Sequence, residues 1–200
     1  MPRTVDHTER RAQIAEALVR VAARDGLHAV TMRSVAAESG VSLRLVQYYF
    51  ETKAQLLLGA LRHLERQSRQ RWSDRLAALP DPAPPRAFVE AFLDEALPTD
   101  AQSRVFHLVG TSYAVLAMTD PELAREPFVS DVDELGRQLT GALERARSHG
   151  QLAEGVDVAT EVAHLLALNN GLGTSILIGQ RAPSEAKAVL SAHLDRIFTG

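Results

Sequence analysis

The sequence of 200 residues contains no cysteine, so it can form neither disulfide bonds nor thiolate metal sites. Residues 1–11 lack the apolar segment of a signal peptide. The most apolar run, residues 162–179, is interrupted by His164, Asn169 and Asn170 and is shorter than the roughly 20 residues that cross a bilayer. We therefore expect a cytoplasmic protein with no membrane partner.

Sequence motifs of enzymes are also missing. The histidines His63, His107, His164 and His193 are scattered, and the chain has no HExxH pair, no glycine-rich phosphate loop and no GxSxG turn. The sequence therefore predicts no catalytic residue, no metal ligand and no cofactor, and we do not expect an enzyme. The alternative is a helical bundle that brings histidines or carboxylates together only in space.

No segment shows the alternation of a β-strand, and apolar residues recur instead at helical spacing, which predicts an all-α fold. Two short helices are expected within residues 31–50. Longer helices are expected over residues 8–25, 52–78, 86–97, 101–118, 121–149, 156–180 and 183–198. The prolines between residues 80 and 85 form a connector, because proline cannot continue a helix.

Residues 31–50, TMRSVAAESGVSLRLVQYYF, have the pattern of a helix-turn-helix. Thr31 can cap the first helix through its side-chain oxygen. Gly40 stands where that helix must end in a backbone conformation that glycine adopts readily. Ser42 can cap the second helix almost at once.

The second short helix has two different faces. Its apolar face is expected to point inward and consists of Val41, Leu45, Val46 and Tyr49. Its other face combines polar and flat apolar groups, namely Leu43, Arg44, Gln47 and Tyr48. A helix with one buried face and one polar face suits a helix that reads DNA.

The residues after this motif, in the order YYFETKAQLL, extend a recognisable pattern. Over residues 8–58 the sequence resembles the tetracycline-repressor (TetR) family of bacterial transcription regulators. The family pattern is matched at Val41, Ser42, Val46, Tyr48, Tyr49, Phe50 and Lys53. The chain departs from the pattern at Arg44, where glycine is common, and at Gln47, where tyrosine is common. No operator sequence can therefore be transferred from a relative.

The resemblance implies a helix-turn-helix DNA-binding domain over residues 1–53 and a helical ligand-binding and dimerisation domain over residues 54–200, joined by a long helix. The charge distribution agrees with this division. Residues 1–53 carry eight basic against six acidic side chains, whereas the whole chain has a formal net charge of −3. A basic end on an acidic body suits a protein that presents one end to DNA phosphates.

Eight residues are predicted to contact DNA: Thr31, Arg33, Ser42, Leu43, Arg44, Gln47, Tyr48 and Lys53. Arg44 is the main candidate for reading a base, because its guanidinium can bond guanine in the major groove. The alternative for Arg44 is a solvated surface side chain. Gln47 can bond adenine or a phosphate, and Lys53 can meet a phosphate at the start of the long helix. Thr31 and Ser42 act as caps, and the resemblance implies that they also touch phosphates.

A small-molecule cavity in the body is implied by the resemblance. Its candidate lining residues are Trp72, Phe88, Phe92, Phe106, His107, Tyr113 and Met118. The alternative is that these side chains form an ordinary core. His107 is the candidate polar anchor, because it lies within an apolar stretch.

The last two helices carry small and apolar residues on broad faces, which allow helices to approach closely. The predicted dimer interface consists of Ala163, Leu166, Ala167, Asn170, Thr174, Leu177, Leu190 and Leu194. Two copies of these helices would form a four-helix bundle; packing within one chain is the alternative.

The favoured function is a homodimeric transcriptional regulator, in the form of a repressor that a small-molecule inducer releases from a palindromic double-stranded DNA operator. The alternative is a helical small-molecule-binding or catalytic protein with a vestigial helix-turn-helix.

Overall fold

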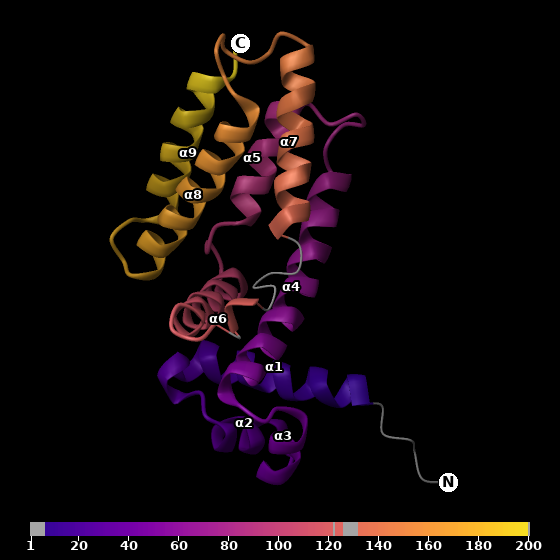
Figure 1. The fold of residues 1–200 in the computed structure, drawn as a ribbon, viewed down its shortest axis with the longest axis vertical. Helices are drawn as coiled ribbons and strands as arrows, with labels where there is room; N and C mark the ends of the chain where they lie inside the picture. The colour runs from indigo at the N-terminus through magenta and orange to yellow at the C-terminus, as the bar shows by residue number, and fades with distance from the viewer. Residues whose placement is uncertain (1–6, 122, 126–131, 200) are drawn as a thin grey trace. The chain divides into compact units, whose positions relative to one another are not determined.

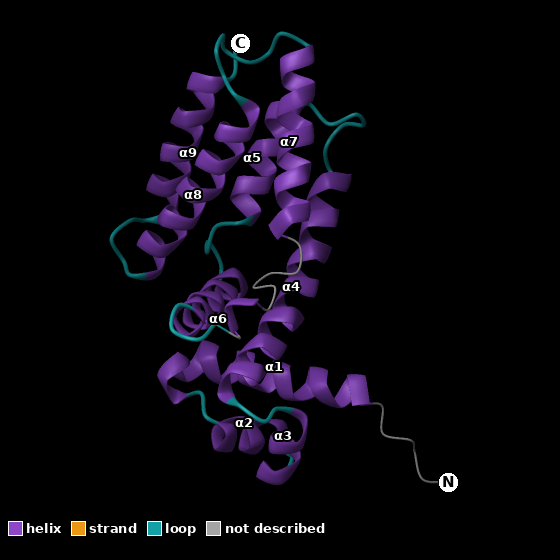
Figure 2. Cartoon of the chain, in the orientation of Figure 1, coloured by secondary structure: helices purple, strands orange, loops and turns teal. Residues whose placement is uncertain are grey.

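The computed structural model describes residues 7–121, 123–125 and 132–199, and these residues form helices and loops (Figure 2). In chain order, as labelled in Figure 1, the helices are α1 (His7–Asp25), α2 (Met32–Ser39), α3 (Leu43–Tyr49), α4 (Lys53–Ala77), α5 (Pro85–Glu95), α6 (Ala101–Ala117), α7 (Val132–Ser148), α8 (Val158–Leu177) and α9 (Pro183–Ile197). Within the described part of the chain, the only β pairing is an isolated bridge between Leu152 and Phe198. The predicted all-α fold is confirmed.

Two short 3-10 helices modify the expected pattern. One, Leu27–Ala29, follows Gly26, whose φ of 80° ends α1, and it was not predicted. The other, Leu123–Arg125, lies in the stretch for which one helix over 121–149 was expected. The described part of that stretch becomes α-helical only at Val132. The part of the prediction that concerns residues 122 and 126–131 lies outside the described residues.

The contacts of the chain define two compact units. The first falls within residues 1–67 and 105–130, and the second within residues 68–104 and 131–200. The helices α4 and α6 therefore each contribute residues to both units. The predicted domain boundary at residue 53 stays a prediction.

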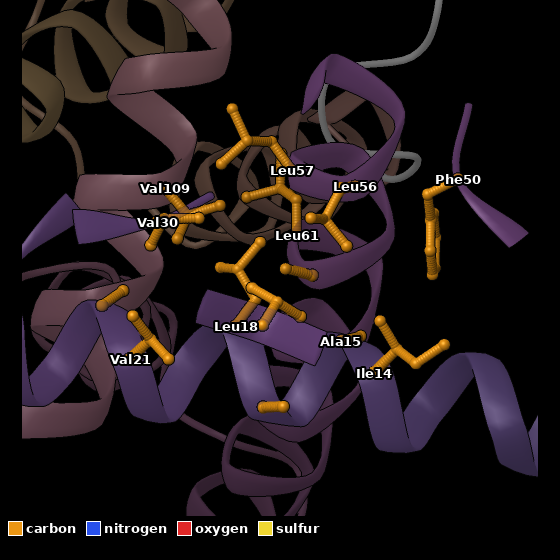
Figure 3. Packing of buried hydrophobic residues seen from close by; sticks show 14 of the residues in the cluster. Ile14, Ala15, Leu18, Val21, Val30, Phe50, Leu56, Leu57, Leu61 and Val109 are labelled. Carbon is orange, nitrogen blue, oxygen red and sulfur yellow. The ribbon is translucent and has the colours of Figure 1, made fainter. Parts of the chain in front are cut away.

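The core of the first unit forms where α1 and α4 pack with α6 (Figure 3). Ile14 and Leu18, one helical turn apart on α1, are fully buried with Leu56 and Leu61 of α4 and Val109 of α6. Full burial of one such side chain contributes about 1.5–3 kcal/mol. This core gives the short helices α2 and α3 a rigid support.

The second unit buries a separate apolar core between α5, α7, α8 and α9 and the last turns of α4. Leu93, Leu143 and Leu165 come from three of these helices, and all are buried. Asn169 is also buried, and its amide Nδ2 donates a hydrogen bond of 3.0 Å to the carbonyl oxygen of Leu93. That bond ties α8 to α5 and satisfies a polar group inside the core.

The structure contains, over the residues that it describes, no helix long and apolar enough to cross a membrane.

Candidate nucleic-acid interface

The start of α2 is held by a reciprocal capping arrangement. The hydroxyl of Thr31 accepts a bond of 3.0 Å from the Ser34 backbone N–H, and the Ser34 hydroxyl accepts one of 2.9 Å from the Thr31 N–H. Two backbone donors that α2 cannot satisfy internally thus find partners. The predicted role of Thr31 as a cap is confirmed.

The turn after α2 depends on Gly40. This residue has φ 69° and ψ 23°, the left-handed conformation that residues with a Cβ adopt at a cost. The N–H groups of Gly40 and Val41 bond carbonyl oxygens at the end of α2. The hydroxyl of Ser42 then accepts a bond of 3.2 Å from the Leu45 N–H and caps α3. Only two residues therefore separate α2 from the cap of α3.

The inner face of α3 is fixed by burial. Val46 is fully buried, and Tyr49 and Phe50 are nearly so, in the core of the first unit. Phe50 lies against Gly59 of α4, where an added Cβ would stand 2.5 Å from the phenyl Cε1 atom. The absence of a side chain at Gly59 is what allows this close approach.

Helix α1 also holds the helix-turn-helix, through polar contacts with α2. Gln13 donates a hydrogen bond of 2.9 Å from its amide to the carbonyl oxygen of Ser39, the last residue of α2. Glu38 accepts bonds from Arg20 at 2.8 Å and Arg24 at 2.9 Å. Hydrogen bonds from Arg20 and then from Arg24 lower the pKa of Glu38. These two arginines are therefore committed to the α1–α2 contact.

Arg44, Gln47 and Tyr48 are the exposed residues of α3 among those predicted to contact DNA, and the others lie on or beside α2, α3 and α4. Seven of the eight predicted residues are exposed: Thr31, Arg33, Ser42, Arg44, Gln47, Tyr48 and Lys53. Leu43 is half-buried. Tyr48 is 69% exposed although it is a large aromatic residue, and it meets the buried Tyr49 ring edge-on at 5.2 Å. A flat, exposed ring on a helix with buried neighbours is a suitable contact group for a sugar, a phosphate or a thymine methyl.

The basic side chains of this surface differ in their pairing from Arg20 and Arg24 of α1. In the described part of the chain, the side chains of Arg33, Arg44 and Lys53 have no ion pair, whereas Arg20 and Arg24 are paired with Glu38. Cations without a protein partner are available to phosphates and to base edges. The arrangement can therefore bind a polyanion.

Two residues near this surface were not anticipated. His7, the first residue of α1, places its Nδ1 2.9 Å from the hydroxyl of Tyr49. The guanidinium of Arg11 lies over the rings of Tyr49 and Phe50, 5.9 and 5.6 Å from their centroids. Both contacts connect residues about 40 positions apart, so no local sequence signal indicates them.

The residues predicted to line a ligand cavity fall into two groups. In the second unit, Trp72 packs edge-on against Phe88 at 5.2 Å and Phe92 at 5.7 Å, and all three are buried. The others belong to the first unit: Tyr113 is fully buried, Phe106 and His107 are half-buried, and Met118 is 79% exposed. The assignment of these residues to a cavity stays a prediction.

The residues predicted at a dimer interface also divide. Along α8, one exposed row consists of Ala163, Ala167, Asn170 and Thr174, flanked by the half-buried Leu166 and Leu177. Leu190 and Leu194 of α9 are only 3% and 1% exposed. These two leucines belong to the protomer's own core, because the inward face of α9 packs on α8 and α5. Their assignment to an exposed interface is thereby corrected.

Over its described residues, the structure groups no three histidine, aspartate or glutamate side chains that could hold a metal ion.

Two family models match the chain. The model of bacterial regulatory proteins of the tetR family matches residues 14–60, and that of the BetI-type transcriptional repressor, C-terminal, matches residues 84–199. Among curated relatives, the HTH-type transcriptional regulator PksA of Bacillus subtilis is 26% identical over 199 residues, covering 98% of this chain and 94% of the relative. The HTH-type transcriptional regulator BetI of Proteus mirabilis is 28% identical over 160 residues, covering 76% of this chain and 80% of the relative.

Solved structures share the fold. A transcriptional regulator from Saccharomonospora viridis in complex with choline superposes with a TM-score of 0.83 at 24% identity, covering 97% of this chain and all of that one. A TetR-family regulator from a Rhodococcus species has a TM-score of 0.77 at 21% identity, covering 94% of this chain and 97% of that one.

Proposed function

Because the chain belongs to the tetR family of bacterial regulatory proteins and is a DNA-binding transcriptional regulator of the repressor type, we propose that it acts as a homodimer that a small-molecule inducer releases from a palindromic operator. The observation that carries the DNA-reading part of the proposal is the exposed row on α3. Arg44, Gln47 and Tyr48 project from a helix whose other face is fixed by Val46 and Tyr49. A reading helix must be held rigidly if its side chains are to discriminate between bases.

The proposed roles on DNA follow from side-chain chemistry. Arg44 reads guanine, Gln47 bonds adenine or a phosphate, and Tyr48 contacts the backbone or a thymine. Lys53 meets a phosphate together with the free N–H groups at the start of α4. Thr31, Arg33, Ser42 and Leu43 complete the contact surface.

The proposed dimer interface is the exposed row of α8. Alanine, asparagine and threonine side chains there leave little bulk between two helices. A Cβ added at Gly171 beside them would meet no heavy atom within 4 Å beyond its chain neighbours and the backbone of its own helix. Two copies joined by a twofold axis present two reading helices to half-sites about 34–36 Å apart, one turn of B-DNA. A symmetric dimer accounts for a palindromic operator.

The proposed inducer is a small organic cation, for which choline is the first probe. The support is the trio Trp72, Phe88 and Phe92 in the second unit, since aromatic rings attract quaternary ammonium groups. The choline complex of the structural neighbour guides the choice of probe. An inducer that binds better to the form with wrongly spaced reading helices shifts the population away from DNA. We assign the transmission to α4, one of the two helices that contribute residues to both units.

Footprinting on the DNA that flanks the protein's own gene tests the proposal. Protection of an inverted repeat, lost on addition of the inducer, is the expected result.

Arg44→Ala is expected to weaken operator binding by about 1–3 kcal/mol and to relax the preference at one base pair of each half-site. Equal operator affinity of the wild type and Arg44→Ala would show that Arg44 does not read a base.

Lys53→Ala serves as the matched control, because it removes an exposed cation of the same surface at a proposed phosphate contact. It should weaken binding to all sequences alike and lower the salt slope by about one. Salt-sensitive binding without any preferred site would contradict the proposed operator recognition.

A further inference from the structure

Arg71 of α4 has a buried nitrogen without a hydrogen-bond partner among the described residues. Its Nε donates a bond of 2.7 Å to Oε1 of Glu95 on α5, whereas its Nη1 is buried and unpaired. The side chain as a whole is 27% exposed. Leaving a charged donor unsatisfied costs about 1–3 kcal/mol or more, so such a group needs an explanation, and a bound ligand is one.

The neighbouring acidic groups already accept hydrogen bonds, and none of these bonds comes from Nη1 of Arg71. Glu95, whose side chain is 8% exposed, receives Arg71 on one oxygen and the Nε of Arg75, also at 2.7 Å, on the other. Asp100 accepts the N–H groups of Gln102 and Ser103. Burial tends to raise the pKa of Asp100, but these bonds and the charge of Arg71 lower it. Glu95 thus holds the guanidinium of Arg71, and the Nη1 atom remains without a hydrogen-bond partner among the described residues.

This nitrogen lies on the helix pair α4–α5, which also carries the buried aromatic trio. Phe88, Phe92 and Glu95 follow one another at i, i+4 and i+7 on α5 and therefore share a face. Consecutive residues of α4 meet that face: Arg71 bonds Glu95, and Trp72 packs on the two phenyl rings. A fixed donor and flat apolar groups thus lie on one helix pair.

We propose that Nη1 of Arg71 recognises an oxygen acceptor of the small molecule bound by the second unit, so that the inducer combines an organic cation with a hydroxyl or carboxylate oxygen. This inference rests on the proposed inducer site and adds a requirement to it. The aromatic rings bind the cationic end, and the guanidinium selects against molecules of the same shape that lack the oxygen. A donor that remains unpaired with the wrong ligand is an effective means of discrimination.

Titration calorimetry on the full chain with three ligands that share a trimethylammonium head tests this. Choline carries a hydroxyl, trimethylglycine a carboxylate, and ethyltrimethylammonium no oxygen. The readout is the ratio of the affinity of each oxygen-bearing ligand to that of ethyltrimethylammonium. For choline, which has the same net charge, this ratio cancels general effects of charge, and for the zwitterion trimethylglycine the charge-matched control variant below corrects for them. In Arg71→Leu this ratio should fall about tenfold for at least one oxygen-bearing ligand, as expected for a lost bond to a charged donor. The ligand whose ratio falls identifies the oxygen as hydroxyl or carboxylate.

Arg75→Leu is the matched control, since it removes the same charge and the other bond to Glu95 but keeps Nη1 of Arg71. Its affinity ratio should equal that of the wild type. Should Arg71→Leu fail to fold, Arg71→Lys is the second variant. It preserves a cation beside Glu95 but has no nitrogen equivalent to Nη1, so it should show the same fall in the ratio.

An unchanged ratio in the Arg71 variants would overturn the proposal, and so would the absence of saturable binding of both oxygen-bearing ligands at millimolar concentrations. Footprinting of the operator does not depend on any of these ligands. Failure of the oxygen requirement is therefore distinguishable from failure of the proposed DNA-binding function.

Discussion

Gly59 on α4 is a residue at which helix propensity and packing oppose each other. Glycine in a helix interior is less favourable than alanine by about 0.8–1 kcal/mol. The Phe50 ring nevertheless occupies the space in which a Cβ would stand, and that ring is buried at the end of the reading helix. Packing therefore decides the residue at this position.

Gly59→Ala is expected to lower the free energy of unfolding by about 1–3 kcal/mol, because a buried ring must move to accept the new methyl group. Chemical denaturation followed by circular dichroism measures the change. Gly136→Ala on α7 is the control: its added Cβ meets no atom within 4 Å, so this substitution should be neutral or stabilising. A Gly59→Ala protein as stable as the wild type would mean that the ring adjusts at little cost.

Among the helices, α8 shows how a terminus responds to pH. Its N-cap is Asp157, whose carboxylate accepts a bond of 2.8 Å from the Thr160 backbone N–H. Hydrogen bonds from the hydroxyl and the N–H of Thr160 lower the pKa of Asp157. A carboxyl whose folded pKa is lowered stabilises the protein above its unfolded pKa and loses that contribution as pH falls through the folded value.

Asp157→Asn is expected to keep its stability near pH 7, because an amide oxygen caps a helix about as well as a carboxylate. Its loss of stability below about pH 4 should be smaller than that of the wild type. Denaturation midpoints measured from pH 7 downward provide the test. Asp157→Ala, which has no cap, should already be less stable at pH 7. Identical pH profiles for the wild type and Asp157→Asn would remove Asp157 as the source of the effect.

For the whole molecule, the proposed twofold assembly depends on the exposed row of α8. Ala163, Ala167, Asn170 and Thr174 present small side chains that the protomer leaves uncovered. Regulators that read palindromes need two copies at a defined spacing. The assembly and the reading of DNA are therefore coupled.

Ala167→Glu is expected to weaken dimerisation at least tenfold, since it introduces a like charge from each copy into a close helix contact. Sedimentation at micromolar concentration should show monomers, and protection of the inverted repeat should be lost. The control, Ala23→Glu on α1, adds the same charge at an exposed alanine outside the proposed interface. A wild-type protein that sediments as a monomer would contradict the model with two half-sites.

Local rules of the sequence accounted for most of the helix-turn-helix. Thr31, Gly40 and Ser42 act within three or four residues of themselves, through caps and a turn, and the structure places each as expected. The all-α class followed from helical spacing in the same way. The identity of the exposed face of α3 was also accessible, because Val46 and Tyr49 mark the face that must be buried.

Long-range packing decided the rest. Leu190 and Leu194 belong to the core rather than to an exposed face, because the rotation of α9 about its axis depends on its neighbours. The contact of His7 with Tyr49 and the unpaired nitrogen of Arg71 likewise arise between residues far apart in the chain or on different helices. A sequence specifies which side chains a helix offers, and only the tertiary structure determines which of them remain without a partner.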